Sequence, residues 1–377
     1  MKKVLLVPDS FKGTMSSAEI CSIMEKAIKM FYPKADVISI PVADGGEGSV
    51  DAFLTALGGE KKIVSVQGPF GQEMKSFFGI LKNGTAVIEM ASCAGLPLVG
   101  DRKDPRITTT YGCGELIKAA LDAGCKKIIM GIGGSATTDG GCGTAAALGV
   151  KFLDKDGKAF VPTGGTLHKI EKIDKSGLDN RLKKIELVTM CDIDNPLYGK
   201  TGAAYVFGPQ KGADPEMVKL LDDGLQHLAE VAKKELSLDM ASTPGAGAAG
   251  GLGYGMKVFL DSQLQMGIET VLNTVNFNEL LKSADCVFSG EGKIDTQSLR
   301  GKVVIGIARR TKKANVPLIA VVGDIGDDIE AAYDEGVSAI FSINRLAIEF
   351  PKAILRAKSD LELTMQNILR FHKLFSK

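Results

Sequence analysis

The chain has 377 residues, which is longer than one hydrophobic core usually supports, so we expect two domains. Its formal net charge is +1, and acidic and basic residues are interspersed, which argues against a nucleic-acid partner. No run of 18 apolar residues occurs, which excludes a membrane span, and seven scattered cysteines without a C-x-x-C pair indicate reduced thiols in the cytoplasm.

The first elements in chain order are two strand–helix pairs. Residues 3–11, KVLLVPDSF, read as a strand, because too few apolar residues precede Pro8 for a signal peptide. Ser16 starts the next helix, with Glu19 completing a capping box. A second strand follows at 36–46 and a second helix at 47–57.

The middle of the chain is a mixed α/β region. Strands are predicted at 61–69, 75–82, 85–91, 126–130 and 184–195, with a hairpin at 150–160. Helices are predicted near 112–123, 142–150, 215–236 and 252–263.

From residue 284 a simple alternation of strand and helix returns. The apolar runs at 285–295, 316–326 and 337–344 are typical of buried parallel strands, and each precedes a helical run. With the two N-terminal strands they make five βα units, a doubly wound parallel sheet of the flavodoxin or Rossmann-like kind. We therefore predict a discontinuous α/β domain over 1–59 and 284–377, interrupted by a mixed α/β domain over 60–283.

Polar residues follow each strand of the predicted discontinuous domain, at the edge where open α/β sheets bind ligands. They are Asp9, Ser10 and Lys12; Asp44 and Glu47; Glu291, Lys293 and Asp295; Asp324, Asp327 and Asp328; Asn344 and Arg345. A single acid of this kind is more often a solvated helix cap. Acids after four successive strands, beside lysines, suit a magnesium ion with phosphates. The three histidines lack the ligand spacing of a zinc site.

The loop GIGGSATTDGG, residues 131–141, joins a predicted strand to a predicted helix. Its start satisfies G-x-G-x-x-A, a dinucleotide-binding pattern, and Asp154 lies at about the required distance. However, Asp154 falls in the predicted hairpin, so the βαβ context is missing and dinucleotide binding is disfavoured. Backbone N–H groups at the helix start, with nearby hydroxyls, could hold a phosphate. The alternative is a tight turn in which glycines allow close packing and Asp139 caps the helix.

Two further loops carry glycine or carboxylate patterns. GKT at 199–201 is not a Walker A motif, because Asp194 stands where its first glycine belongs. Asp192 and Asp194 follow an apolar strand and point to one side of an extended chain, so they could share a cation or divide between cation and base. The G-x-G-x-x-G of residues 245–250 is a weak signal, because no strand precedes it.

Six segments together resemble the bacterial type I glycerate kinases. They are PDSFKGTMSS, VADGGEGS, GIGGSATTDGG, CDIDNPLYGKTGAAYVFGPQKGA, GAGAAGGLG and SGEGKIDTQSLRGK. The resemblance extends from Pro8 to about Gly323, while SINRLAIEF is less similar to the family. It implies ATP-dependent phosphorylation of D-glycerate with Mg²⁺, giving 2-phosphoglycerate, in a two-domain enzyme whose active site lies between the domains.

Phosphoryl transfer depends on positioning and charge neutralisation, and we assign roles on that basis. Nucleotide phosphates are assigned to Gly133, Gly134, Ser135, Thr137, Thr138 and Lys211. Catalytic roles are assigned to Asp192, Lys12 and Lys293, and metal binding to Asp192 and Asp295. Substrate binding is assigned to Asp9, Ser10, Asp44, Glu291 and Arg300.

Two other functions and the oligomeric state stay open at this point. The glycine patterns allow an NAD-dependent oxidoreductase acting on a small hydroxy acid, which would bind NAD rather than ATP. A non-catalytic phosphate-binding regulator is a second alternative, although the acidic edge argues against it. The expected partners are ATP and D-glycerate, and a homodimer is one possible oligomeric state.

Overall fold

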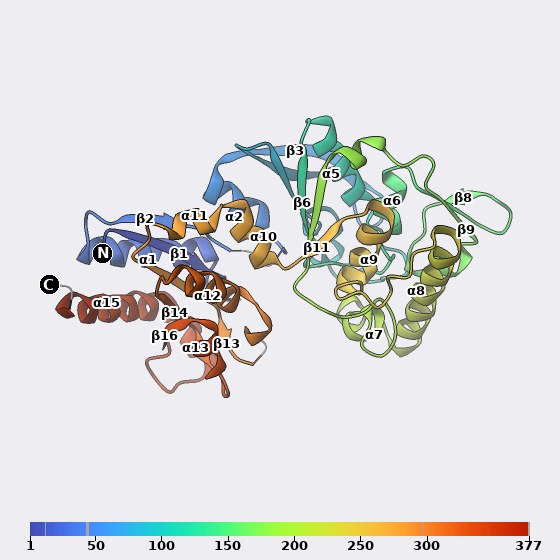
Figure 1. Ribbon diagram of the computed structural model, residues 1–377. Coiled ribbons are helices and arrows are strands. Elements are labelled where there is room, and N and C mark those ends of the chain that lie inside the picture. Colours follow the sequence, from blue (N-terminus) through green and yellow to red (C-terminus); the bar gives the residue numbers. More distant parts are fainter. Residues whose placement is uncertain (12, 43–44, 297, 376–377) are drawn as a thin grey trace. The chain divides into compact units, whose positions relative to one another are not determined.

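The computed structural model describes residues 1–11, 13–42, 45–296 and 298–375 (Figure 1). Contacts between residues divide the chain into two compact units. Unit 1 comprises Met1–Ala43, Thr55–Leu57 and Ile268–Lys377, and unit 2 comprises Asp44–Leu54 and Gly58–Gly267.

Unit 1 is built on a five-stranded parallel sheet in the order β16-β14-β12-β1-β2. Its strands are β1 (Lys3–Pro8), β2 (Asp36–Ser39), β12 (Cys286–Gly290), β14 (Leu318–Val322) and β16 (Val337–Ser342). Numbered one to five along the chain, they are arranged 2-1-3-4-5, the order of the flavodoxin fold. The predicted fold class is therefore confirmed. The edge strand β2 ends at Ser39, before its predicted limit, although the N–H groups of Ile40 and Val42 still donate to the carbonyls of Leu6 and Pro8.

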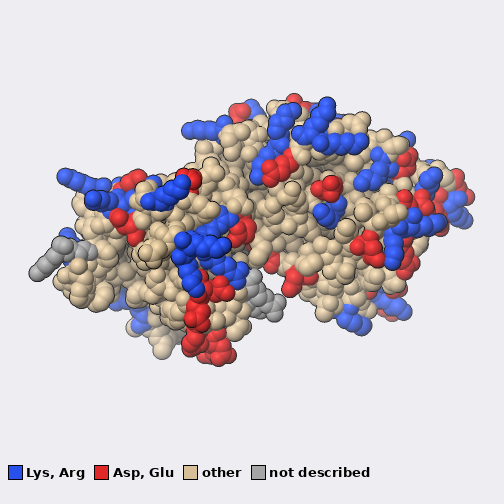
Figure 2. All heavy atoms as spheres, in the orientation of Figure 1, with Lys and Arg blue, Asp and Glu red and all other residues tan. Residues whose placement is uncertain are grey.

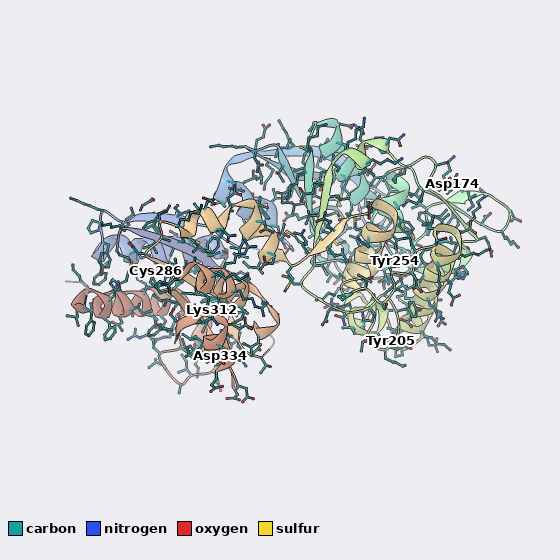
Figure 3. The ribbon with its side chains drawn as sticks, in the orientation of Figure 1. Asp174, Tyr205, Tyr254, Cys286, Lys312 and Asp334 are labelled. Carbon is teal, nitrogen blue, oxygen red and sulfur yellow. The ribbon has the colours of Figure 1, made fainter. Side chains whose placement is uncertain are left out.

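Helices cover the sheet of unit 1. They are α1 (Ser17–Phe31), α10 (Gly267–Thr274), α11 (Phe277–Leu281), α12 (Val303–Ala314), α13 (Ala331–Glu335), α14 (Phe350–Ile354) and α15 (Ala357–Phe375). The predicted capping box is confirmed, since Ser16 and Glu19 bond each other's backbone N–H. Val4 and Leu6 of β1 join one apolar core with α1 and α15. Lys312 of α12 donates to the carbonyl of Asp334 in α13 at 2.5 Å, and Figure 3 labels both.

Short elements complete unit 1 near the ends of its strands. The two-residue strands β13 (Lys293–Ile294) and β15 (Asp324–Ile325) pair in parallel, and the 3₁₀ turn η4 spans Ser298–Arg300. Strand β13 follows β12 and strand β15 follows β14, so both lie beyond the carboxyl ends of the central strands. This placement matters for the candidate site described below.

Unit 2 contains a six-stranded mixed sheet in the order β11-β10-β6-β5-β4-β3. Its strands are β3 (Gly59–Gln67), β4 (Glu73–Leu81), β5 (Thr85–Glu89), β6 (Lys127–Gly131), β10 (Glu186–Met190) and β11 (Gln263–Gln265). Strands β5, β6, β10 and β11 are parallel to one another. Strand β4 is antiparallel to both of its neighbours, β3 and β5. A small sheet holds β7 (Lys151–Leu153), β8 (Ala159–Phe160) and β9 (Lys172–Asp174), and the β7–β8 pairing confirms the predicted hairpin.

The helices of unit 2 surround a large apolar core. They are α2 (Ser49–Leu57), whose last residues group with unit 1, α3 (Ala91–Ala94), α4 (Leu96–Val99), α5 (Tyr111–Asp122), α6 (Cys142–Ala147), α7 (Ala203–Phe207), α8 (Pro215–Leu236) and α9 (Ala248–Leu260). The 3₁₀ turns are η1 (Gly164–Lys169), η2 (Asn180–Lys184) and η3 (Pro209–Lys211). Helix α8 matches its predicted limits, with Asp214 as its cap. Tyr254 of α9, labelled in Figure 3, is buried in this core.

The two units differ in their limits from the predicted domains. Residues 44–54 group with unit 2, because Gly45 and Gly46 pack closely on Gly131 and Gly133. Residues 268–283 group with unit 1, where α11 contacts α12. The units are groups of contacting residues, so the limits of independent domains stay a prediction. None of the described helices is both long and apolar enough to span a bilayer.

Candidate functional site

Four loops of unit 2 pack against one another at the carboxyl edge of its parallel strands. We call residues 45–46, 131–141, 191–202 and 245–251 the loop cluster. The N–H of Gly133 donates to the carbonyl of Gly45 at 3.0 Å. A Cβ on Gly250 would lie 1.9 Å from the carbonyl oxygen of Thr137, and one on Gly247 would lie 2.2 Å from that of Pro196. The glycine patterns of the sequence therefore serve backbone-to-backbone packing in this structure.

The polar side chains of the 131–141 loop are buried rather than exposed. Ser135 is 6% exposed, and Thr137 and Thr138 are fully buried. The Ser135 hydroxyl accepts from the Thr137 N–H and lies 3.1 Å from the Thr137 hydroxyl. The Thr138 hydroxyl has no hydrogen-bond partner among the described residues. The Ser135 and Thr137 hydroxyls are thus held together, and the contact of all three hydroxyls with phosphate stays a prediction.

Asp139 occupies the start of helix α6. Its carboxylate accepts from the N–H groups of Gly141 and Gly143, and from both the N–H and the hydroxyl of Thr110. Burial raises the pKa of Asp139, and these hydrogen bonds oppose that rise. The N-cap of α6 is Gly141, and the Asp139 carboxylate satisfies N–H groups at the cap and in the first turn from the preceding loop. An anion would therefore have to bind through the hydroxyls and not at the first turn of α6.

Lys211 reaches the same loop from the turn η3. The side chain is 2% exposed, and its Nζ donates to the carbonyl of Thr137 at 2.5 Å and to the Ser135 hydroxyl at 3.4 Å. Burial lowers the pKa of Lys211 to about 7, and the charge of Asp139 partly offsets this. A lysine held in this way fixes the loop and places a titratable amine beside its hydroxyls.

Asp192 lies at the same edge of the sheet. It follows β10, which pairs with β6 so that Met190 is opposite Gly131, the first residue of the 131–141 loop. The Asp192 side chain is half-buried, and its Oδ1 accepts from the N–H of Gly267 at 2.7 Å. The strand pairing thus brings the predicted catalytic carboxylate and the predicted nucleotide loop to one edge of unit 2.

The second gathering of predicted residues is in unit 1, at the point where its strand order reverses. In a 2-1-3-4-5 sheet, ligands bind between the carboxyl ends of the first and third strands, which here are β1 and β12. Asp9 and Ser10 follow β1, and Glu291 follows β12. The Asp9 N–H donates to the carbonyl of Gly290 at 2.8 Å, and its Oδ1 accepts from the Ser10 N–H at 2.7 Å. Three predicted substrate residues therefore flank this reversal point.

Glu291 is the most buried carboxylate of this group. It is 7% exposed, and its Oε1 has no hydrogen-bond partner within the part of the chain that the structure describes. Burial raises the pKa of Glu291 to about 7. Asp9 and Asp295 raise it further, whereas a hydrogen bond from Ser298 and the charge of Lys302 lower it.

The structure describes some of the remaining predicted site residues and leaves others out. Asp295 is half-buried and its N–H donates to the Ser298 hydroxyl, while Lys293 is exposed on β13. Lys12 and Asp44 lie outside the described residues, as does the side chain of Arg300. The roles predicted for these five residues therefore stay predictions.

The carboxylates of both edges suit magnesium, although they form no complete metal cage. Among the described residues, no group of three or more His, Cys, Asp or Glu side chains could hold a metal ion. Magnesium is commonly held by one or two carboxylates together with phosphate oxygens and water. Asp192 in unit 2 and Asp295 in unit 1 each carry carboxylate oxygens of the kind that Mg²⁺ prefers, and their metal-binding roles stay predictions.

Glu89 is a residue of the site region that the sequence interpretation missed. It ends β5 and is 2% exposed. Its carboxylate accepts from the backbone N–H groups of Gly48, Ser49 and Val50 at the start of α2, while burial raises its pKa. Glu89 thus holds the segment that follows Gly45 and Gly46 in the loop cluster. The sequence contained one indication of this role, an acid at the end of the apolar run TAVI.

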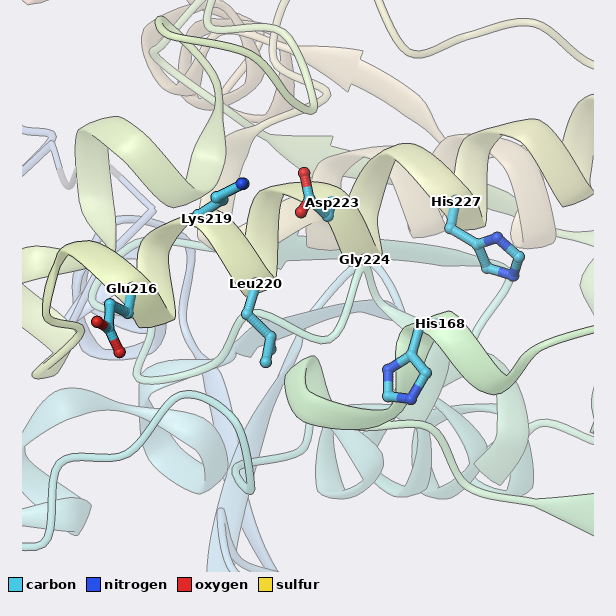
Figure 4. Close-up of a pocket in the computed structure, with 7 residues that line it drawn as sticks. All are labelled: His168, Glu216, Lys219, Leu220, Asp223, Gly224 and His227. Carbon is cyan, nitrogen blue, oxygen red and sulfur yellow. The ribbon is translucent and has the colours of Figure 1, made fainter.

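A surface pocket of about 400 Å³ lies elsewhere on unit 2, between α8 and η1. Its lining residues are His168, Glu216, Lys219, Leu220, Asp223, Gly224 and His227, of which only His168 comes from η1 (Figure 4). The Nε2 of His227 lies 2.7 Å from the carbonyl oxygen of Ile170, a contact that fixes the position of the imidazole ring. None of the predicted site residues lines this pocket.

The surface charge is mixed. On the face drawn in Figure 2, acidic and basic side chains are interspersed over both units.

Comparison with known proteins gives a consistent result over the whole chain. The family model described as "Glycerate kinase family" matches residues 4–373. The chain is 46% identical to a glycerate kinase of Bacillus subtilis (strain 168), covering 99% of this chain and 98% of that protein. It is 45% identical to a glycerate 2-kinase of Escherichia coli (strain K12), covering 90% of each. A crystal structure assigned as a glycerate kinase 2 from Salmonella typhimurium LT2 is 40% identical, with a TM-score of 0.87 over 99% of this chain and 98% of that one.

Proposed function

The chain belongs to the glycerate kinase family, and from this premise we propose that it transfers the γ-phosphoryl group of ATP to the 2-hydroxyl of D-glycerate. The observation that carries this proposal is similarity to glycerate kinases over nearly the full length of the chain. The protein is a glycerate kinase, a phosphotransferase with an alcohol group as acceptor, and ATP is the donor that such a kinase implies. The relatives named above do not support the oxidoreductase alternative.

The nucleotide phosphates are proposed to bind at the loop cluster of unit 2. The hydroxyls of Ser135 and Thr137 lie there beside the amine of Lys211, and the buried Thr138 hydroxyl belongs to the same loop. A Cβ on Gly133 would lie 2.8 Å from the Cα of Gly46, and Gly134 has a φ of 75°, so both positions of this loop favour glycine. Hydroxyl and amine donors of this kind favour the negative charge of phosphate oxygens.

Magnesium is proposed to bind at Asp192 of unit 2, and Asp295 of unit 1 stays a predicted metal ligand. A bound Mg²⁺ would neutralise charge on the phosphates during transfer. The Asp192 carboxylate is held by the N–H of Gly267, so its orientation is defined before any ligand arrives. The chain's own contribution is therefore a pre-positioned oxygen at the end of β10.

Glycerate is proposed to bind where the strand order of unit 1 reverses. Asp9, Ser10 and Glu291 flank that point, and Ser10 can donate to a substrate oxygen through its hydroxyl. Arg300 stays the predicted partner of the glycerate carboxylate, because a guanidinium forms bidentate pairs with carboxylates. Lys12 and Lys293 stay the predicted groups that neutralise the transferred phosphoryl, and Asp44 a predicted substrate contact.

Removing two hydroxyls from the loop cluster tests the proposed nucleotide site. We expect Ser135→Ala combined with Thr137→Ala to weaken ATP binding by roughly a hundredfold or more, since each lost hydrogen bond to a charged group is worth about 1.5–3 kcal/mol. Isothermal titration calorimetry measures the affinity, and Ser359→Ala, on helix α15, is the matched control. An unchanged ATP affinity in a folded double variant would exclude these hydroxyls from the nucleotide site.

The reaction itself is tested by identifying the product. Incubation with ATP, Mg²⁺ and D-glycerate should give one phosphorus NMR signal matching 2-phosphoglycerate. A signal of 3-phosphoglycerate would correct the position of transfer, and the absence of any phosphorylated acid would contradict the proposed function. A thermal shift with NAD but not with ATP would favour the oxidoreductase alternative.

The cellular setting is part of the same proposal. The seven cysteines are free thiols, and six of them are buried, which supports a reducing compartment such as the cytoplasm. The homodimer stays a prediction that sedimentation analysis can test.

A further inference from the structure

Two predicted carboxylates, Asp192 and Glu291, could accept the proton that the glycerate hydroxyl loses, and their surroundings differ. Asp192 is half-buried, and its Oδ1 already accepts from the backbone N–H of Gly267 at 2.7 Å. Glu291 is 7% exposed, and its Oε1 is without a hydrogen-bond partner within the described residues. An unpartnered buried oxygen is costly, so its presence calls for a ligand or a reaction that uses it.

The position of Glu291 supports such a use. It directly follows β12, which pairs with β1 so that Gly290 is opposite Pro8. This is the reversal point of the strand order, where doubly wound sheets bind their ligands. Of the carboxylates that follow β1 and β12, Glu291 is the one whose side chain is more than nine-tenths buried.

We propose that Glu291 is the general base of the reaction, accepting the proton of the glycerate hydroxyl on Oε1. This rests on the proposed function, because it needs a hydroxyl acceptor at the reversal point. As the hydroxyl O–H bond breaks, that oxygen forms a bond to the γ-phosphorus and the bond from phosphorus to the bridging oxygen of ADP breaks. The proton passes to Glu291 and then to solvent, so the step is balanced without another reactant.

The charged groups around Glu291 are consistent with this role. The charge of Asp9, at the end of β1, acts on Glu291, and so do the charges of Asp295 and Lys302 in the segment that leads into α12. Burial and the two acids together hold the pKa of Glu291 near 7, with Lys302 and the Ser298 hydrogen bond opposing them. A base is most effective when its pKa lies close to the working pH.

The first test compares turnover with binding. We expect Glu291→Gln to lower kcat by roughly a hundredfold or more, the usual contribution of general-base catalysis. Its affinities for ATP and for D-glycerate, measured by calorimetry, should stay within about threefold of wild type if the loss lies in the proton transfer. Glu349→Gln, an exposed acid of the same unit, is the matched control and should leave kcat unchanged. A Glu291→Gln variant within about threefold of the wild-type kcat would overturn the proposal.

The second test is the pH profile, which a purely structural role would not move. In wild type, kcat/KM for D-glycerate should fall as pH drops below about 7, because Glu291 of the free enzyme becomes protonated. The residual rate of Glu291→Gln should lose this acidic limb, whereas Asp192→Asn should keep it at a lower kcat. A limb that arises from titration of ATP would persist in every variant. If the limb is the same in Glu291→Gln as in Asp192→Asn, the proposal fails.

A third measurement shows whether Glu291→Gln folds and whether the carboxylate is as buried as the structure indicates. The folded-state pKa of Glu291 lies above its ordinary value of 4.5, so the wild-type carboxyl is best tolerated when protonated. Relative to Glu291→Gln, wild type should lose stability as pH rises from about 4.5 to about 7 and then level off. The melting temperature of Glu291→Gln should accordingly exceed that of wild type at pH 8.

These outcomes separate the proposal from its premise. If wild type forms no phosphoglycerate, the proposed function is wrong and the role of Glu291 falls with it. If wild type is active while Glu291→Gln keeps both its rate and its acidic limb, only the general-base assignment is wrong.

Discussion

Replacing Asp192 with Asn should lower kcat by at least roughly a hundredfold while the fold survives. The Asn side chain keeps an oxygen that can accept from the N–H of Gly267, so the contact at 2.7 Å is retained. The negative charge is lost, and with it the attraction for Mg²⁺ and the compensation of phosphate charge. A coupled assay for ADP at several Mg²⁺ concentrations measures the effect.

The control for this substitution is Asp239→Asn, an exposed acid of unit 2 that pairs with Lys233. It should leave kcat unchanged, because surface ion pairs contribute little and Asp239 is not a predicted site residue. Circular dichroism and thermal melting establish that Asp192→Asn is folded. Wild-type turnover in a folded Asp192→Asn variant would remove this residue from the chemistry.

Lys211→Met should make the protein more stable near pH 6 and nearly inactive. The folded-state pKa of Lys211, about 7, lies below its ordinary value of 10.5, because burial disfavours the charged amine. The resulting cost to stability is full below about pH 7 and disappears as pH rises towards 10.5. A shift of this size corresponds to about 5 kcal/mol, from which the two lost hydrogen bonds of the charged amine subtract about 1.5 kcal/mol or more each. The net gain in the free energy of unfolding is therefore at most about 2 kcal/mol at pH 6.

The same substitution removes the amine that holds Thr137 and Ser135. We expect kcat/KM for ATP to fall by at least roughly a hundredfold, because the loop loses both its positioning and a phosphate-neutralising group. Lys175→Met is a matched control, since Lys175 is half-buried and donates to the carbonyl of Val258 at 3.0 Å, yet belongs to no predicted site. Denaturant unfolding and steady-state kinetics check both parts. A Lys211→Met variant that is active or less stable than wild type would contradict this account.

The glycine loops illustrate where sequence reasoning reached its limit. The patterns at Gly131 and Gly245 both match dinucleotide fingerprints, and context alone disfavoured that interpretation. In the structure, a Cβ on Gly131 would lie 2.3 Å from the carbonyl of Gly45, and one on Gly245 would lie 2.8 Å from the Cys191 sulfur. The partner segments are distant in sequence, so no local pattern could have named them.

Local physics in the sequence determined the secondary structure and, through the count of βα units, the fold class. The capping box at Ser16 and the proline start of α8 needed only neighbouring residues, and both are present as predicted. The carboxyl ends of successive parallel strands meet at one edge, so acids such as Asp192 and Glu291 could be named in advance as candidates.

The tertiary structure decided what those candidates can do. Several properties of these residues depend on segments that are far apart in the chain. Glu291 is buried, and Asp192 accepts a hydrogen bond from the N–H of Gly267. Lys211 donates to the carbonyl of Thr137, and Glu89 accepts from the N–H groups at the start of α2. Desolvation and hydrogen bonding set a side chain's pKa and freedom to react, and both are properties of the packed environment rather than of the residue. The sequence therefore determined which chemical groups the protein has and which strands carry them, while only the packed chain determined their chemical state.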